Sequence, residues 1–310
     1  MRRSPFHRTV VTTTVLTYML IAVGGLVRAS GAGLGCPDWP RCFGGWIPPA
    51  SAAELPPQFD AAQFNPALMW TEYLNRLLGV MVGFAMLTTA VAAWRWHRRN
   101  PRVVGPALAA LLLTGFQGWL GGRVVAHELA AWIVTAHLLV ALMIVALLIW
   151  ATIESAVDGE PASRGEPARR ALGWWTWGVV GLFLVEVTLG TQVRERVDEA
   201  FALVSRDRAL AAVGTLALVH EVMAVVVVTA VAALWIRVRT RHARDRVLMR
   251  ASGAALACTI GQVLAGAVLT SLALPPAAQV LHLTLASLLL GALAATALVA
   301  WRWPPTAPAT

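Results

Sequence analysis

The feature that most constrains this chain is a series of eight long stretches of mainly apolar residues. They lie at about 10–29, 67–94, 103–125, 132–153, 171–193, 212–236, 250–271 and 278–301. A helix that crosses a bilayer needs about 20 such residues. Only 13% of the residues are charged, against roughly 25% in soluble proteins. The sequence therefore predicts an all-α integral membrane protein with eight transmembrane helices, and it excludes a cytosolic enzyme, a disulfide-rich secreted module and a disordered regulator.

The arginines predict the orientation of these helices. The net charge is +9 and every basic residue is Arg, a balance that in a soluble chain would suggest nucleic acid. One side holds most of them, at the N-terminus, in 95–102, 164–170 and 237–250, and at 302. The other side holds Arg28, Arg41, Arg123, Arg194, Arg196, Arg206 and Arg208. By the positive-inside rule, we expect a multi-pass protein of the plasma membrane with both termini in the cytoplasm and no nucleic-acid partner.

The two halves of the chain resemble each other. A shift of 145 residues places four positions of the first half on positions of the second: Asn75 on His220, Gln117 on Gln262, Gly121 on Gly266 and His137 on His282. Residues 24–28 resemble 190–194 at a shift of 166. Each half has an even number of spans, so the copies are parallel repeats. We expect two tandem pseudo-symmetric four-helix bundles, at 1–153 with an outer loop at 30–66 and at 171–310, joined by a cytoplasmic linker at 154–170.

Three histidines lie within predicted spans, where ionisable groups are costly and usually functional. They are His137, His220 and His282, and a rise of about 1.5 Å per residue places them roughly 7–12 Å inside the outer ends of their helices. Two neutral imidazoles at one depth, as predicted for His220 and His282, suit the axial ligation of a haem iron. Buried histidines with satisfied hydrogen bonds, or a proton relay, are the alternatives. Zinc is disfavoured because it needs three or four close ligands.

The remaining four histidines are predicted to lie in loops or at helix ends. We expect them to be ordinary surface residues: His7, His97, His127 and His242.

The first half departs from the symmetry of the histidines. Asn75 occupies the position that matches His220 and is a poor ligand for haem iron, so His137 is the one obvious ligand there. Glu72 lies three residues before Asn75 and therefore on the same helical face. An i,i+4 ion pair of Glu72 with Arg76 that only neutralises two costly charges is one interpretation. A functional Glu beside an open-sided cofactor fits at least as well.

Other residues leave alternatives open. Cys36 and Cys42 flank five residues of the Gly- and Pro-rich outer loop. Because that side of the membrane is oxidising, we expect a disulfide, as a structural staple rather than a redox-active pair. Glu186 and Glu221 also fall within spans, and the sequence assigns neither a role.

These residues together resemble the heme A synthase family, membrane enzymes that supply haem A to haem-copper terminal oxidases. The resemblance extends from about residue 15 to 295. It rests on four segments and three histidines: Gly24-Gly25-Leu26-Val27-Arg28, Gly33-Leu34-Gly35-Cys36-Pro37-Asp38-Trp39-Pro40, Glu72-Tyr73-Leu74-Asn75-Arg76, Gln117-Gly118-Trp119-Leu120-Gly121-Gly122, His137, His220 and His282.

The resemblance implies a role for each half. It points to His220 and His282 as axial ligands of a haem b in the second bundle. It places the substrate haem O in the first bundle, with His137 as a ligand and with Asn75 and Arg76 beside it. The family usually has His at position 75, so Asn75 is a departure. Glu72 matches the family's essential acid.

The implied reaction oxidises a ring methyl of haem O to a formyl group by successive hydroxylations whose oxygen comes from water. The implied partners are haem O, haem O synthase, terminal-oxidase assembly factors and the lipid bilayer. The alternative function is a non-catalytic, haem b-binding electron-transfer or oxidase-assembly protein. A transporter with parallel repeats is a weaker alternative, because the notable polar residues lie toward the outer face rather than near the midplane.

Overall fold

The computed structural model describes residues 5–156, 167–201 and 203–302. Within these ranges, eight helices are long and apolar enough to cross a membrane, which confirms the predicted all-α membrane fold. They are α1 (Pro5–Ala29), α2 (Pro66–His97), α3 (Pro101–Ala126), α4 (Ala131–Ala156), α5 (Pro167–Phe201), α7 (Thr215–Arg241), α8 (Arg246–Ser271) and α9 (Pro276–Arg302). Short helices lie between them, at η1 (Ala32–Leu34), η2 (Ala52–Glu54), η3 (Ala61–Gln63) and α6 (Arg206–Val213).

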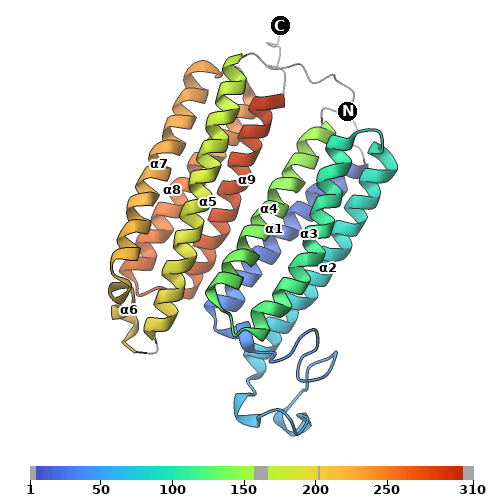
Figure 1. The fold of residues 1–310 in the computed structure, drawn as a ribbon, viewed down its shortest axis with the longest axis vertical. Coiled ribbons are helices and arrows are strands. Elements are labelled where there is room, and N and C mark those ends of the chain that lie inside the picture. Colours follow the sequence, from blue (N-terminus) through green and yellow to red (C-terminus); the bar gives the residue numbers. More distant parts are fainter. Residues whose placement is uncertain (1–4, 157–166, 202, 303–310) are drawn as a thin grey trace.

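The eight long helices form two adjacent rings of four (Figure 1). In the first ring, α1, α2, α3 and α4 each pack on the next, and α4 packs on α1. Helices α5, α7, α8 and α9 pack in the same cyclic order. Each ring has its own apolar core, which includes Met86 and Leu148 in the first and Leu234 and Leu293 in the second. The boundaries at 153 and 171 stay predictions, because residues 157–166 of the expected linker lie outside the described residues.

Polar caps set the start of several long helices. Asn65 and Asn100 accept hydrogen bonds from the first backbone N–H groups of α2 and α3, and a proline follows each of them. This combination favours a helix start because the cap satisfies free donors and proline has none to satisfy. Asp245 caps α8 in the same way, and its other oxygen accepts a 2.7 Å hydrogen bond from the buried Arg169 of α5. The caps Asn100 and Asp245 lie in short turns, so α2 and α3, and likewise α7 and α8, run antiparallel.

The structure differs from the sequence predictions near the membrane surfaces. Helix α5 continues to Phe201 instead of ending near 193, which makes it about 52 Å long at 1.5 Å per residue. The hydrocarbon core is only about 30 Å thick, so the charged residues from Arg194 to Glu199 lie beyond it. His97, expected at the surface, is buried with its ring centroid 5.0 Å from that of Phe6. The pattern could not reveal this contact, because α1 supplies the covering side chain.

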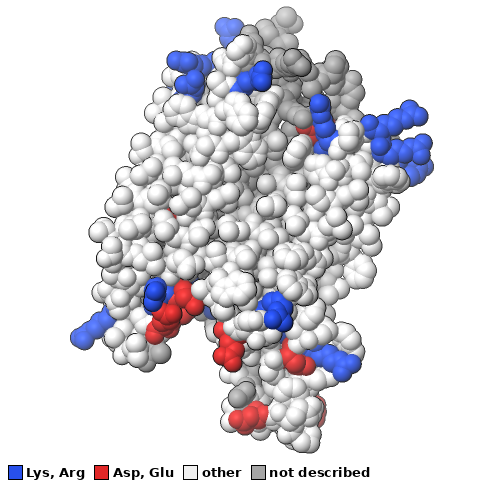
Figure 2. All heavy atoms as spheres, viewed as in Figure 1, with Lys and Arg blue, Asp and Glu red and all other residues white. Residues whose placement is uncertain are grey.

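The charged side chains gather at the two ends of the molecule (Figure 2). Arg dominates the end where α1 starts and α9 finishes, while acidic residues gather mostly toward the opposite end. The apolar middle faces outward between them, with exposed side chains such as Val80, Phe84, Leu112 and Leu264. This is the surface that a bilayer would cover.

The two rings meet through α1, α4, α5 and α9. Gly291 of α9 lies where α1 and α4 cross it, and a Cβ there would overlap the Tyr18 hydroxyl and lie 2.9 Å from Ile149 Cδ1. Near the start of α4, the Thr135 hydroxyl donates a 2.9 Å hydrogen bond to the Thr191 hydroxyl of α5. The rings are therefore joined by close packing and by polar contacts.

Replacing Gly291 with Ala should weaken this junction. The added methyl has no space, and overpacking of this kind costs about 1–3 kcal/mol. We expect the G291A protein to lose its native fold at a lower temperature in detergent, as measured by circular dichroism. The control is G178A in α5, where a Cβ meets nothing within 4 Å. A G291A protein as stable as G178A would contradict the expected clash.

Candidate functional site

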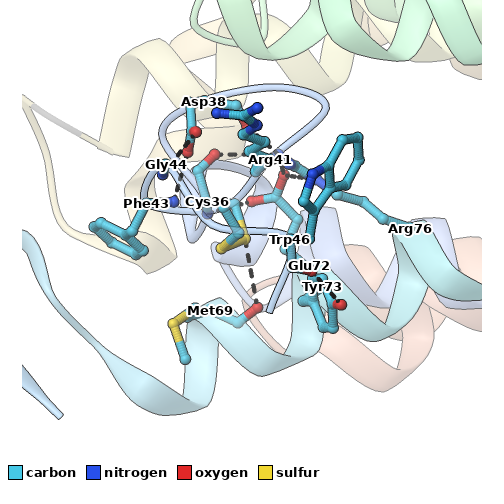
Figure 3. Close-up of a disulfide and its surroundings, with 11 residues drawn as sticks. Cys36, Asp38, Arg41, Phe43, Gly44, Trp46, Met69, Glu72, Tyr73 and Arg76 are labelled. Carbon is cyan, nitrogen blue, oxygen red and sulfur yellow. Dashed lines mark hydrogen bonds and ion pairs between the residues drawn. A yellow bond between two sulfur atoms is a disulfide. The ribbon is translucent and has the colours of Figure 1, made fainter. Parts of the chain in front are cut away.

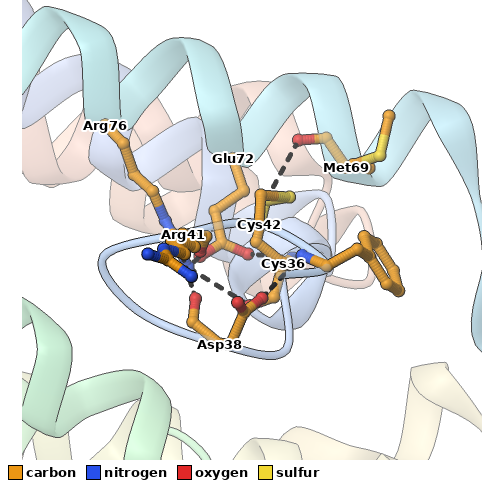
Figure 4. Close-up of polar contacts among 8 residues, drawn as sticks. Cys36, Asp38, Arg41, Cys42, Met69, Glu72 and Arg76 are labelled. Atoms are coloured by element: carbon orange, nitrogen blue, oxygen red, sulfur yellow. Dashed lines mark hydrogen bonds and ion pairs between the residues drawn. A yellow bond between two sulfur atoms is a disulfide. The ribbon is translucent and has the colours of Figure 1, made fainter. Parts of the chain in front are cut away.

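The outer loop is tied to α2 through Glu72 and Arg76 (Figures 3 and 4). Glu72 is buried, and its Oε2 accepts a 2.8 Å hydrogen bond from the Cys36 amide. Its Oε1 accepts two hydrogen bonds from the Arg76 guanidinium, one of them a 3.1 Å bond from Nε. Arg76 also donates to three loop carbonyls, at 3.2 Å for Cys36 and at 2.7 Å for both Asp38 and Arg41. Glu72 and Arg76 thus satisfy the hydrogen bonds of one amide and three carbonyls in the loop.

The loop segment is further shaped by the predicted disulfide, which the structure confirms between Cys36 and Cys42. The Asp38 carboxylate accepts hydrogen bonds from the amides of Phe43 and Gly44, at 2.6 and 2.9 Å. Gly35 brings the segment against α2, since a Cβ there would lie 2.5 Å from the Leu68 carbonyl oxygen. The segment 35–44 is therefore a compact unit fixed on the outer part of α2.

The ion pair between Glu72 and Arg76 was one of the two interpretations of these residues. The structure contains it, and it does more than neutralise two charges, because Arg76 also binds the loop. Whether Glu72 takes part in chemistry stays a prediction.

The same segment reaches across to α3. The Trp39 ring lies against Gly122, where a Cβ would be 2.7 Å from the ring. A cavity of about 320 Å³ opens between Trp39, Trp119 and Arg123. Gly121, which precedes Gly122 in α3, lies beside the His137 ring. The loop therefore lies over the outer end of the ring that contains His137.

The three predicted histidines are arranged alike. Each lies five or six residues inside the outer end of its helix, and each ring packs against a glycine of a neighbouring helix. The Cβ positions of these glycines lie 3.1–3.8 Å from the imidazole Cε1 in three pairs: Gly121 with His137, Gly190 with His220 and Gly266 with His282. A Cβ at Gly190 would press on the His220 ring, while one at Gly121 or Gly266 would lie in ordinary van der Waals contact with its histidine.

His220 and His282 come from opposite corners of the second ring, on α7 and α9. Within the described part of the chain, no group of three or more His, Cys, Asp or Glu is placed to hold a metal ion. Two imidazoles from opposite helices instead fit an iron that a planar macrocycle already holds and that needs only axial ligands.

Asn75 occupies the corner of the first ring that His220 occupies in the second. Its Oδ1 is buried and accepts no hydrogen bond. Gly24, which matches Gly190, has open space where its Cβ would lie. The first ring thus has room for a ring-sized side chain at this corner, and the chain places only a short amide there.

Sequence reasoning missed one close contact of this site. Glu186 of α5 is buried, and its Oε1 lies 2.9 Å from Nδ1 of His220. The i,i+4 spacing of Glu186 and Gly190 was a usable signal, because it puts both on the α5 face that meets His220. Glu221, by contrast, is exposed.

The comparison with known protein families covers both rings. Residues 7–294 match the family model COX15-CtaA, described as cytochrome oxidase assembly protein. The chain belongs to this family. The matched range includes Glu72, Asn75, Arg76 and all three membrane histidines. Every predicted site residue of this cytochrome oxidase assembly family member therefore lies within that range.

Individual relatives carry a more specific name. The chain is 30% identical over 202 residues to a heme A synthase of Sphingopyxis alaskensis and 32% identical over 201 residues to one of Methylorubrum populi. These alignments cover 58% and 57% of this chain, and 55% and 50% of the relatives. A heme A synthase of Maricaulis maris is 26% identical over 219 residues, or 61% of this chain and 62% of the relative. The alignments therefore span only about half the length of these curated relatives.

Proposed function

We propose that this protein is a heme A synthase, which oxidises a ring methyl of haem O to a formyl group for the assembly of haem-copper oxidases. The observation that carries the proposal is the repeated arrangement of an imidazole on a glycine in both rings, with the buried Glu72 in only one of them. One ring would hold a haem permanently, and the other would bind the haem that reacts. The family membership and the names of the relatives support this reading.

The second ring is proposed to hold haem b between His220 and His282. The two imidazoles come from opposite corners at similar depth, and their neighbouring glycines leave space beside each ring. When bound, haem b supplies one-electron redox chemistry. The imidazoles of His220 and His282 would hold it, within a ring of helices that has its own apolar core.

The first ring is proposed to bind haem O through His137. Ala217 takes the place of Glu72 in the second half, so the first ring alone has a carboxylate at this position of its second helix. Oxidation of a ring methyl develops positive charge, which a fixed carboxylate in low dielectric stabilises. Oε2 of Glu72 accepts the Cys36 amide and has a further lone pair for a proton from the attacking water. Arg76 and the loop hold that oxygen in place.

We further propose that the two rings are repeats of one unit and that both termini lie in the cytoplasm of the plasma membrane. The shared cyclic packing order supports the repeat. The gathering of Arg at the end where α1 starts and α9 finishes supports the orientation. Haem O, haem O synthase, oxidase assembly factors and the bilayer are the proposed partners.

The proposal is tested by expressing the protein with a source of haem O and by separating the extracted haems chromatographically. A heme A synthase yields haem A together with protein-bound haem b. The competing function, a non-catalytic haem b protein, is favoured by Asn75 in place of a ligand. It would give full haem b content and no haem A, and that result would overturn the enzymatic proposal.

Asn75 offers a separate test of the substrate ring. The open space beside Gly24 leaves room for an imidazole, so N75H should add a second axial ligand opposite His137. We expect most of the haem O bound in this ring to change from a high-spin to a six-coordinate low-spin absorption spectrum. N75Q, which keeps an amide, is the control. Identical spectra for N75H and N75Q would place haem O elsewhere.

A further inference from the structure

Glu186 is a buried carboxylate that neither the redox reaction nor the loop contacts explain. It lies on α5 with 7% of its surface exposed, inside a helix that crosses the membrane. A charged side chain at such a position is expensive and usually marks a functional contact. The partner that the structure gives it is the imidazole of His220, at 2.9 Å between Oε1 and Nδ1.

The contact involves Nδ1, one of the two nitrogens of the His220 imidazole, and leaves Nε2 to bind a metal. A histidine that binds a metal through Nε2 commonly directs Nδ1–H to a carboxylate, which fixes the tautomer and makes the ligand more basic. Nδ1 and Oε1 already lie at hydrogen-bonding distance, although the N–H is not aligned with the oxygen. Gly190, one turn along α5, leaves the space in which the ring can turn.

The other corners of the two rings have no such carboxylate. Among the described residues, no Asp or Glu forms an ion pair with His282 or His137. At the shift of 166 that aligns Gly24 with Gly190, Leu20 takes the place of Glu186. The carboxylate therefore belongs to one ligand of one ring.

We propose that Glu186 is a positioning residue that holds His220 for haem b and increases the basicity of its Nε2. This rests on the proposed function, because it requires haem in the second ring. A more basic ligand stabilises the ferric state more than the ferrous state. Glu186 therefore keeps the reduction potential of this haem lower than two neutral imidazoles alone would.

The test is a redox titration of the purified, haem-loaded protein, followed by absorption. In E186Q the carboxylate charge is lost while the side chain keeps its size. Changes in the contacts behind metal ligands typically alter metal affinity 10- to 100-fold. A tenfold loss of preference for ferric iron equals about 59 mV for one electron, so the potential of E186Q should rise by about that amount or more.

The matched control is E221Q, which removes the same charge from an exposed residue adjacent to His220 in sequence. E221Q should keep the wild-type potential. E186D, which retains a carboxylate, should return most of the way to the wild-type potential. If E186Q binds no haem, recovery of haem in E186D supports the proposal, and loss in both variants overturns it.

Two further outcomes separate the ideas. A wild-type potential in haem-loaded E186Q, or equal shifts in E186Q and E221Q, overturns the role of Glu186 and leaves the proposed function intact. A wild-type protein that carries no haem b removes the proposed function itself.

Discussion

Replacing His220 with Ala should remove nearly all haem b from the purified protein. The substitution deletes one of the two proposed nitrogen ligands of the second ring and leaves Glu186 without its partner. A cavity also opens beside Gly190. The measurement is the haem b content per protein, from the reduced-minus-oxidised spectrum and from extracted pigment. H282A should have the same effect, because both ligands are required for a six-coordinate iron.

The control for this experiment is H127A. His127 is exposed at the end of α3, where it contacts Arg123 and Trp132. The H127A protein should keep its full content of haem b. If H220A retains haem b with an unchanged spectrum, then the cofactor is held elsewhere and the assignment of the second ring is wrong.

Replacing Glu72 with Gln should nearly abolish the formation of haem A. The amide oxygen can still accept the Cys36 amide, so the loop contact is preserved, while the negative charge and the proton-accepting oxygen are lost. General acid–base groups contribute about 10²–10⁴-fold to rates, and we expect a loss of that order. Extracted pigment should contain haem O or a hydroxylated intermediate in place of haem A, with haem b unchanged.

Glu54 provides the matched control for Glu72. It lies in the same outer loop, and its carboxylate also accepts a backbone N–H, from Ala50 at 2.9 Å, but the side chain is exposed. E54Q should produce haem A normally. Normal haem A from E72Q would remove Glu72 from the mechanism and leave it as an anchor of the loop.

Arg76 separates the anchoring role from the catalytic one. R76K keeps a positive charge beside Glu72 but loses the planar donor array that serves three loop carbonyls. We expect faster protease cleavage within 36–44 in R76K than in E72Q. Faster cleavage in E72Q than in R76K would show that the ion pair, rather than the carbonyl contacts, holds the loop.

The sequence predicted those features that depend on local pattern. Hydropathy located all eight spans, because each helix carries its own apolar run whatever it packs against. The histidines stood out because ionisable groups are rare in such runs. Cys36 and Cys42 were predicted to form a disulfide because their loop was placed on the oxidising side of the membrane. The length of α5 was missed because charge marks where a membrane ends, not where a helix ends.

Contacts between distant segments could not be predicted in this way. The Cys36 amide and Glu72 are far apart in the chain, and only the folded loop brings them together. The burial of His97 depends on Phe6 of another helix. The i,i+4 spacing of Glu186 and Gly190 puts both on one face of α5, but only the packing of α5 on α7 shows that this face meets His220.

If the two rings are repeats, as proposed above, the junction between them corresponds to a symmetric dimer contact. If α1 corresponds to α5 and α4 to α9, then α4 meets its own counterpart, and the contact of α1 with α9 mirrors that of α4 with α5. A true homodimer makes such an isologous contact from two identical chains, so every substitution appears twice. Covalent fusion lifts that restriction and makes pairing independent of concentration. One copy can then exchange an imidazole for Asn75 and carry Glu72, while its twin retains His220.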